Sequence, residues 1–338
     1  MIVIQNYPLA ILLCIMAMVC WGSWQNTQNL IGKPWRFELY YWDFVVGILL
    51  TSLVSALTIG SLGSQGRTFM QDIMQAELPY IGSAMLGGAI WNLGTLLLIA
   101  AISIAGMSVA FPIGGGIGWL LGIIVNYNSD QVKNPQALFI GLVVLAMAIF
   151  FSMISYKKLA KEQQKTTFKG LLLSFLAGLL IAFFYKFVAS SLAANNIDES
   201  GKIVLEAGKL SPYTAVFLFS IGALVCTIIF NPFFMRKPVQ GEPVAIGEYF
   251  KGSTKAHLYG LLGGAIWCAG NILSFMAANT ASPAISYGLS NAAPLVATLW
   301  GIFAWKEFKA APKGTNLYLS LMFGAYLVGL ILITIANA

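Results

Sequence analysis

Two apolar segments of this chain carry the same five residues, Gly-Gly-Ala-Ile-Trp, at positions 87–91 and, 176 positions later, at 263–267. Each motif is followed by a second apolar segment with an internal proline, Pro112 in the first place and Pro294 in the second. Paired segments interrupted by glycine and proline at corresponding positions are typical of membrane carriers built from two repeats. The repeat therefore predicts two copies of one membrane unit around a shared cavity.

The composition supports a lipid environment. Hydrophobic residues make up 58% of the 338 residues and charged residues 9%, whereas soluble domains have about 45–50% and about 25%. The formal net charge of +7 does not indicate nucleic-acid binding, because the basic residues lie in short breaks between apolar segments, as in membrane topology.

Cysteine and histidine offer little material for a metal site. Cys14, Cys20, Cys226 and Cys268 lie in apolar segments without paired spacing, so we expect buried packing residues and neither disulfides nor a metal site. The single histidine, His257, leaves almost nothing for a zinc site or a histidine relay. No GxxxxGK[ST] phosphate loop is present. We therefore expect no cofactor and no enzymatic activity.

The hydropathy pattern predicts an all-α integral membrane protein. A spanning helix needs about 20 mainly apolar residues, and ten segments qualify: 8–29, 39–60, 79–102, 104–126, 136–156, 169–192, 213–234, 257–279, 283–305 and 316–336. Almost nothing separates the third from the fourth segment, or the eighth from the ninth. Each of these pairs is expected to form a tight hairpin.

Basic residues are divided unequally between the two sets of loops. One set carries fourteen: Lys33, Arg36, Lys157, Lys158, Lys161, Lys165, Lys169, Arg236, Lys237, Lys251, Lys255, Lys306, Lys309 and Lys313. The other set carries four: Arg67, Lys133, Lys202 and Lys209. Basic loop residues stay cytoplasmic, so we predict a multi-pass protein of the cell inner membrane with both termini in the periplasm.

The lysine-rich segment 157–168 divides the chain into a first five-helix repeat, residues 1–156, and a second, residues 169–338. Because each repeat has five helices, corresponding helices run in opposite directions, which is an inverted repeat. The periplasmic loop at 193–212 is polar, and we expect it to be mobile.

Two helix faces are candidates for the lining of the cavity. By helical spacing, one face combines Gly88, Trp91, Asn92 and Thr95, and the other combines Gly264, Trp267, Asn271 and Ser274. An asparagine that faced lipid would leave its amide without partners, so both faces should point inward. The alternative is helix packing, with glycine allowing close approach and tryptophan filling space.

Other polar residues within the apolar segments complete the candidate set. Trp24 and Gln25 lie in the outer part of the first segment, and Ser290 and Asn291 precede the proline of the ninth. We predict that all four contact the substrate, although Trp24 and Gln25 also fit an aromatic, polar membrane interface.

Two charged residues lie within the apolar segments, Asp43 and Lys186. Ionisable residues inside a membrane segment usually have a function. The alternatives are that Asp43 caps its helix at the interface and that Lys186 extends to the membrane surface.

The chain resembles the drug/metabolite transporter superfamily, and within it the glucose/ribose porters, the bacterial rhamnose–proton symporters and the plant ureide permeases. Gly22-Ser23-Trp24 resembles the Gly-Thr-Trp of the ureide permeases, and Tyr41-Trp42-Asp43 resembles their Tyr-Leu-Asp. The run from Gly263 to Glu307 is similar to their penultimate hairpin. The chain departs from them in its short central loop and in Lys186, where a small residue or proline is expected.

The resemblance implies a ten-helix carrier that imports a small, neutral, polar metabolite with protons. Asp43 belongs to the matching motif and is the expected proton-coupling residue, and Lys186 is expected to orient the substrate. Indoles stack on sugars or flat rings, and amides bind hydroxyls or carbonyls. Our first interpretation is a proton-coupled monosaccharide importer that works by alternating access.

Three alternatives stay open at this stage. The first is a permease for a ureide or a nucleobase-like heterocycle, the second an exporter of hydrophobic drugs or metabolites, and the third a membrane scaffold or receptor that transports nothing. The expected partners are a small molecule, protons or another coupling ion, and the lipid bilayer. The carrier is expected to be a monomer or a homodimer.

The topology can be tested with C-terminal fusions. Because the basic loop residues are so unequally divided, a C-terminal alkaline phosphatase should be active and a C-terminal green fluorescent protein dark. The reverse pattern would overturn the predicted orientation.

Overall fold

The computed structural model describes residues 1–31, 35–128, 131–159, 167–199 and 201–338. The spanning and connecting helices, in chain order, are α1 (Tyr7–Ser23), α2 (Asn26–Asn29), α3 (Phe37–Leu57), α4 (Phe69–Gln75), α5 (Leu78–Ala105), α6 (Met107–Val125), α7 (Pro135–Leu159), α8 (Phe168–Ser191), α9 (Pro212–Arg236), the 3₁₀ helix η2 (Ile246–Lys251), α10 (Thr254–Ala281), α11 (Pro283–Ser290), α12 (Ala293–Phe303) and α13 (Thr315–Ile335). The strands β1 (Asn195–Ile197) and β2 (Ile203–Leu205) form one antiparallel hairpin.

Within the described ranges, eight helices are long and apolar enough to cross a membrane. The expected span at 104–126 is α6, which contains Pro112 and yields a shorter apolar helix, Val109–Val125. The expected continuous span at 283–305 is wrong: the helix breaks at Asn291–Ala292 into α11 and α12. The break directly precedes α12, which carries Pro294 in its first turn, where a proline without an N–H is tolerated.

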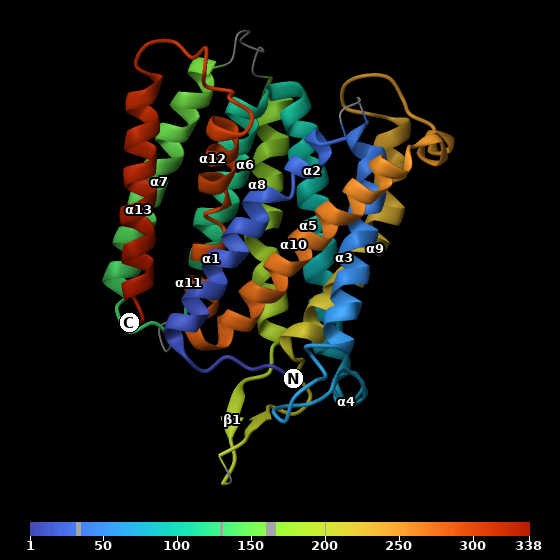
Figure 1. Cartoon of the computed structure of the whole chain (residues 1–338), viewed down its shortest axis with the longest axis vertical. Helices are drawn as coiled ribbons and strands as arrows, with labels where there is room; N and C mark the ends of the chain where they lie inside the picture. Colours follow the sequence, from blue (N-terminus) through green and yellow to red (C-terminus); the bar gives the residue numbers. More distant parts are fainter. Residues whose placement is uncertain (32–34, 129–130, 160–166, 200) are drawn as a thin grey trace.

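The two ends of the bundle differ (Figure 1). Both termini, α4 and the β-hairpin lie at one end, here called the terminal end. The loop that joins α9 to α10 and the loop that joins α12 to α13 lie at the other, here called the basic end. Most of the expected basic linker 157–168, with Lys161 and Lys165, falls outside the described residues, as does Lys33.

The expected short connections are present, and they are nearly identical. One residue, Gly106, joins α5 to α6 with φ 78° and ψ 155°, and one residue, Ser282, joins α10 to α11 with φ 76° and ψ 152°. The positions are 176 apart, the same offset as the Gly-Gly-Ala-Ile-Trp motifs. Glycine adopts positive φ at no steric cost whereas serine does not, so tertiary packing holds Ser282 in this conformation.

Two helix crossings bring backbones into direct contact, and they use corresponding residues. A Cβ at Gly88 of α5 would overlap the carbonyl oxygen of Phe219, and one at Gly222 of α9 would overlap that of Met85. A Cβ at Gly264 of α10 would likewise overlap the carbonyl oxygen of Phe44. Small residues permit such contacts between membrane helices, so these glycines set the distance between α5 and α9 and between α10 and α3.

The α3–α10 crossing is completed from the other side. A Cβ at Gly47 of α3 would overlap the carbonyl oxygen of Leu261. Each crossing thus has a glycine on both helices, and each glycine faces the partner's backbone.

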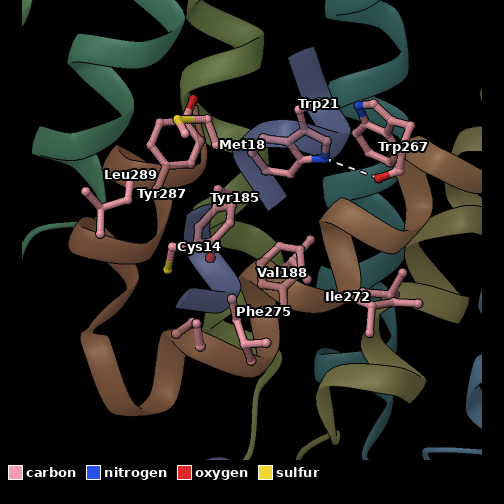
Figure 2. Close-up of a cluster of buried hydrophobic side chains, with 14 of the residues drawn as sticks. Cys14, Met18, Trp21, Tyr185, Val188, Trp267, Ile272, Phe275, Tyr287 and Leu289 are labelled. Carbon is pink, nitrogen blue, oxygen red and sulfur yellow. Dashed lines mark hydrogen bonds between the residues drawn. The ribbon is translucent and has the colours of Figure 1, made fainter. Parts of the chain in front are cut away.

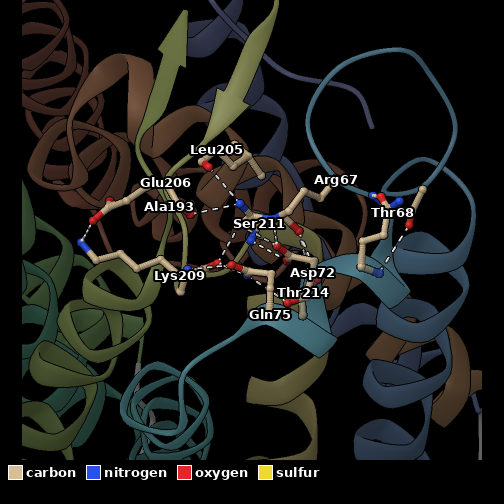
Figure 3. A network of polar contacts seen from close by, with 12 residues as sticks. Arg67, Thr68, Asp72, Gln75, Ala193, Leu205, Glu206, Lys209, Ser211 and Thr214 are labelled. Carbon is tan, nitrogen blue, oxygen red and sulfur yellow. Dashed lines mark hydrogen bonds and ion pairs between the residues drawn. The ribbon is translucent and has the colours of Figure 1, made fainter. Parts of the chain in front are cut away.

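A buried ion pair organises the terminal end (Figure 3). Arg67 lies 2.9 Å from the fully buried Asp72 carboxylate and donates to the carbonyl oxygens of Leu205, Glu206 and Lys209. The second Asp72 oxygen accepts from the Ser211 amide at 2.7 Å. The loop at 193–212, which the sequence predicts to be mobile, contains the β-hairpin, and these bonds tie its second strand to Arg67, just before α4.

The crossings generate a stability prediction. Gly88→Ala should destabilise the fold by about 3 kcal/mol or more, above the usual cost of overpacking, because a backbone carbonyl cannot rotate away as a side chain can. Gly82→Ala in the same helix is the matched control, since nothing lies within 4 Å of its added Cβ. Thermal unfolding of the purified variants measures both; equal melting temperatures would contradict the crossing.

Candidate functional site

Four aromatic rings meet at the centre of the bundle. Trp91 of α5 and Trp267 of α10, from the two repeated motifs, have ring centroids 4.0 Å apart. Phe219 lies 5.5 Å from Trp91 and 5.7 Å from Trp267, and Phe44 lies 6.4 Å from each tryptophan. Phe44 and Phe219 are the residues whose carbonyls face Gly264 and Gly88. The helix crossings therefore position this aromatic quartet, Phe44, Trp91, Phe219 and Trp267.

Trp21 of α1 extends the quartet (Figure 2). Its ring stacks on Trp267 at 6.1 Å, and its indole N–H donates to the Trp267 carbonyl oxygen at 3.2 Å. Gly270 makes room for this contact, because an added Cβ would lie 2.7 Å from the Trp21 ring.

A cavity of about 190 Å³ lies against the tryptophans of the quartet. Five of the predicted site residues line it: Trp24, Gln25, Trp91, Trp267 and Asn291. Its wall also includes Ile102 near the last turn of α5 and Phe111 near the start of α6. The cavity therefore extends from the centre toward the basic end.

The lining combines flat rings with a few neutral polar groups. Asn291 donates its amide N–H to the Tyr287 carbonyl oxygen at 3.0 Å, which keeps the amide in place. The Tyr326 hydroxyl is buried with no hydrogen-bond partner among the described residues, and its ring stacks on Trp119 at 5.8 Å. None of the described residues that line the cavity is charged. The geometry suits an uncharged polar molecule with a flat or apolar face.

Asn92 and Asn271 do not line the cavity. Asn92 is fully buried, and its amide oxygen accepts from the Tyr41 hydroxyl at 2.6 Å and the Thr227 hydroxyl at 3.2 Å. Asn271 is equally buried, and neither of its amide atoms has a partner among the described residues. The offset of 176 pairs Asn271 with Thr95 and not with Asn92.

A buried hydroxyl cluster separates the cavity from the terminal end. The Tyr185 hydroxyl lies 3.0 Å from the Ser274 hydroxyl and donates to that of Ser286 at 3.1 Å. Tyr287, beside it in Figure 2, donates to the Gly118 carbonyl oxygen at 2.8 Å. Ser290 is buried at the end of α11 and is not among the cavity residues. These bonds tie α11 to α6, α8 and α10.

Lys186 lies away from the aromatic cavity. Its side chain is exposed, and the ammonium donates to the Val125 carbonyl oxygen, at the last residue of α6, at 3.2 Å. It lines a second cavity, at the terminal end, together with Glu206, Lys209 and Asn279. A lysine that extends toward the surface and bonds a helix C-terminus fits the alternative stated from the sequence.

Asp43 also lies outside the aromatic cavity, although it is next to Phe44 of the quartet. Its carboxylate accepts from the Tyr249 hydroxyl at 2.5 Å and lies 2.8 Å from His257 Nδ1. The sequence reasoning dismissed His257 because it is the only histidine and lies at a helix end. No spacing rule connects it to Asp43, which is 214 positions away.

The sequence reasoning also missed Trp119, Tyr326 and Trp21. Trp119 and Tyr326 line the cavity from segments in which no polar residue marked a candidate face, and Trp21 lines it three residues before the candidate Trp24. The only signal available was a large aromatic residue inside an apolar segment, which is more often a packing residue.

Apolar spanning helices around a central aromatic cavity define a multi-pass membrane protein of the transporter class. The family model described as Ureide permease matches residues 40–166 and 147–336. The chain therefore belongs to the ureide permease family.

Curated relatives extend over the whole chain. Ureide permease 1 of Arabidopsis thaliana is 25% identical over 97% of this chain and 97% of its own. The putative sugar uptake protein YxfA of Lactococcus lactis is 25% identical, with 97% and 98% covered. One solved crystal structure shares the fold, with a TM-score of 0.57, 13% identity and coverage of 97% of this chain and 99% of that chain.

The buried Asn92 generates a prediction about stability. Asn92→Leu should destabilise the fold by about 1–3 kcal/mol, because it leaves the buried Tyr41 hydroxyl without its acceptor. Asn29→Leu, at an exposed amide of α2, should have no such effect. The melting temperatures of the purified proteins test this, and an unchanged value for Asn92→Leu would show that the bond contributes nothing.

Proposed function

We propose that this protein is a secondary active transporter that imports a small, neutral, polar solute of the ureide or flat heterocycle class by alternating access. The supporting observation is the central cavity, whose described lining residues include five tryptophans and two amides and no charge. Amides bind the carbonyl and N–H groups of a ureide, and an uncharged wall excludes ions because their desolvation is not compensated.

The family relation favours a ureide over our first interpretation, a monosaccharide. The plant relatives that cover nearly the whole chain are named ureide permeases. A monosaccharide is the second candidate, since YxfA is named a putative sugar uptake protein. Indole rings that stack on a flat heterocycle also stack on the C–H face of a sugar, so the lining accommodates both.

The proposal includes two inverted five-helix repeats, 1–156 and 169–338, with the basic segment 157–168 between them and ten membrane crossings in all. Two observations support it. The single-residue connections at Gly106 and Ser282 have the same backbone angles at the offset of the repeated motif. The glycines of one helix crossing have counterparts at the other at offsets of 175 and 176.

In the proposed orientation the basic end is cytoplasmic and both termini are periplasmic, in the inner membrane of the cell. The aromatic cavity then extends toward the cytoplasm, and the hydroxyl cluster around Tyr185 closes the periplasmic side. Trp24, Gln25, Trp91, Trp267 and Asn291 contact the solute, and Asp43 carries the coupling proton.

Uptake by the purified protein in proteoliposomes tests the function. We expect radiolabelled allantoin to be taken up, unlabelled allantoin and uracil to compete, and glucose and rhamnose to compete weakly. Uptake of a sugar without competition by allantoin would replace the ureide with the second candidate. No uptake of any of these solutes would contradict the proposed substrate class.

Gln25 offers a sharper test of the cavity. Gln25→Leu removes an amide from the lining, and the loss of one neutral hydrogen bond, about 0.5–1.5 kcal/mol, should raise KM for allantoin about 2- to 10-fold. Asn29→Leu, which removes an exposed amide outside the lining, is the control. Equal KM values for the two variants would remove Gln25 from the site.

A further inference from the structure

We infer that Asp43 and His257 form one proton-binding pair, closed over by Tyr249, and that this pair takes up and releases the coupling proton at the basic end. The inference rests on the proposed transport function and assigns two residues to it that the sequence did not connect with Asp43. Asp43 lies on α3, Tyr249 on η2 and His257 on α10.

The pair is built for a shared proton. Asp43 Oδ2 lies 2.8 Å from His257 Nδ1, and the two side chains are 5% and 26% exposed. A buried carboxylate is costly unless it is paired. Histidine is the side chain whose ordinary titration lies near neutral pH. The more exposed imidazole connects the buried carboxylate to solvent, which gives the proton a route.

Tyr249 holds the pair closed. Its hydroxyl donates to Asp43 Oδ1 at 2.5 Å, and its ring lies edge-on to His257 at 4.7 Å. Burial, and then the Asp43 carboxylate, raise the pKa of Tyr249, which therefore stays a neutral donor. Tyr249 is thus a positioning residue: it covers the pair when η2 lies against α3.

No other ionisable side chain of the described residues bonds to the pair. Tyr40, on the same helix as Asp43, bonds to the Thr27 hydroxyl instead. The charged residues of the neighbouring elements pair with one another or are exposed: Arg36 with Glu38, Glu248 with Lys251, and Arg236 and Lys255 at the surface.

The fold itself does not require these polar groups. At the offsets that relate the two crossings, 175 and 176, the counterparts of Asp43, His257 and Tyr249 are Leu218, Ile81 and Ile73, all hydrocarbon. Gly260, where a Cβ would overlap that of Asp43, corresponds to Ala84. The same helix crossing is thus built once without charge and once around a carboxylate, which points to a function specific to one half.

Proton binding has a defined consequence for this site. Without the shared proton the pair has a net charge of −1, and with it the pair is neutral. Burying the neutral pair costs less free energy than burying the charged pair, so protonation favours the closed site seen here. Loss of the proton favours entry of water and release of Tyr249. Movement of η2 would thereby link protonation to the conformation of the basic end.

Allantoin transport in proteoliposomes tests the pair. His257→Gln and Asp43→Asn should lose accumulation driven by a pH gradient, so that the ratio of inside to outside allantoin concentration stays at about 1. Both variants should keep counterflow exchange within 2-fold of wild type. Tyr249→Phe should accumulate allantoin with a changed pH profile. Lys255→Gln, which removes an exposed cation from the same turn of α10, is the control and should keep both activities. Wild-type accumulation by His257→Gln would overturn the inference.

A combined variant protects the test against misfolding. Asp43→Leu with His257→Ile copies the residues of the other half, and should fold and exchange allantoin without pH-driven accumulation. Should it accumulate allantoin against a gradient, the inference is wrong.

A second measurement needs no substrate. The chain has one histidine, so protein labelled with ¹³C only at the histidine Cε1 gives a single side-chain resonance. Its dependence on pH should differ between wild type and Asp43→Asn, and identical curves would overturn the pair. If wild type fails to exchange allantoin, the proposed substrate is contradicted. The pH dependence of this resonance then tests the Asp43–His257 pair without any substrate.

Discussion

The direct contact of helix backbones at two crossings is the constraint on which the rest of this structure depends. Gly88 and Gly222 bring α5 against α9, and Gly47 and Gly264 bring α3 against α10. Without side chains between them, the helices place the rings of the aromatic quartet in contact. In lipid, where apolar surface provides no net driving force between helices, close packing of this kind is a main source of association. The cavity is a consequence of these crossings.

The two halves of the proposed repeat differ in chemistry. Connections and crossing glycines recur at offsets of 176 and 175 residues, whereas the carboxylate–imidazole pair has hydrocarbon counterparts. A buried charge in a membrane protein costs free energy unless it is paired, whereas apolar helix packing has no such cost. We therefore expect buried charges only where function needs them. The terminal end, in contrast, uses its charges structurally: every polar contact of Arg67 ties one connecting segment to another.

The two charges within the spans show what the sequence alone leaves open. Both are single ionisable residues in apolar segments, so hydropathy alone treats them alike. The structure places Lys186 at the end of α6, bonded to a carbonyl oxygen, and places Asp43 beside a histidine 214 positions away. The partners decide the role of each charge, and they come from other helices.

The sequence by itself determined the membrane class, the short connection in each half, and a central place for the two repeated tryptophans, because these depend on hydropathy and local spacing. The short motifs that resemble those of ureide permeases pointed to the family whose model matches the chain. Only the tertiary structure decided that Asn92 is a partner of Tyr41 and Thr227, that the ninth segment breaks at Asn291, and that His257 contacts Asp43. Helical periodicity shows which residues share a face. It does not show which other helix that face meets, and in lipid the polar contacts follow from that pairing.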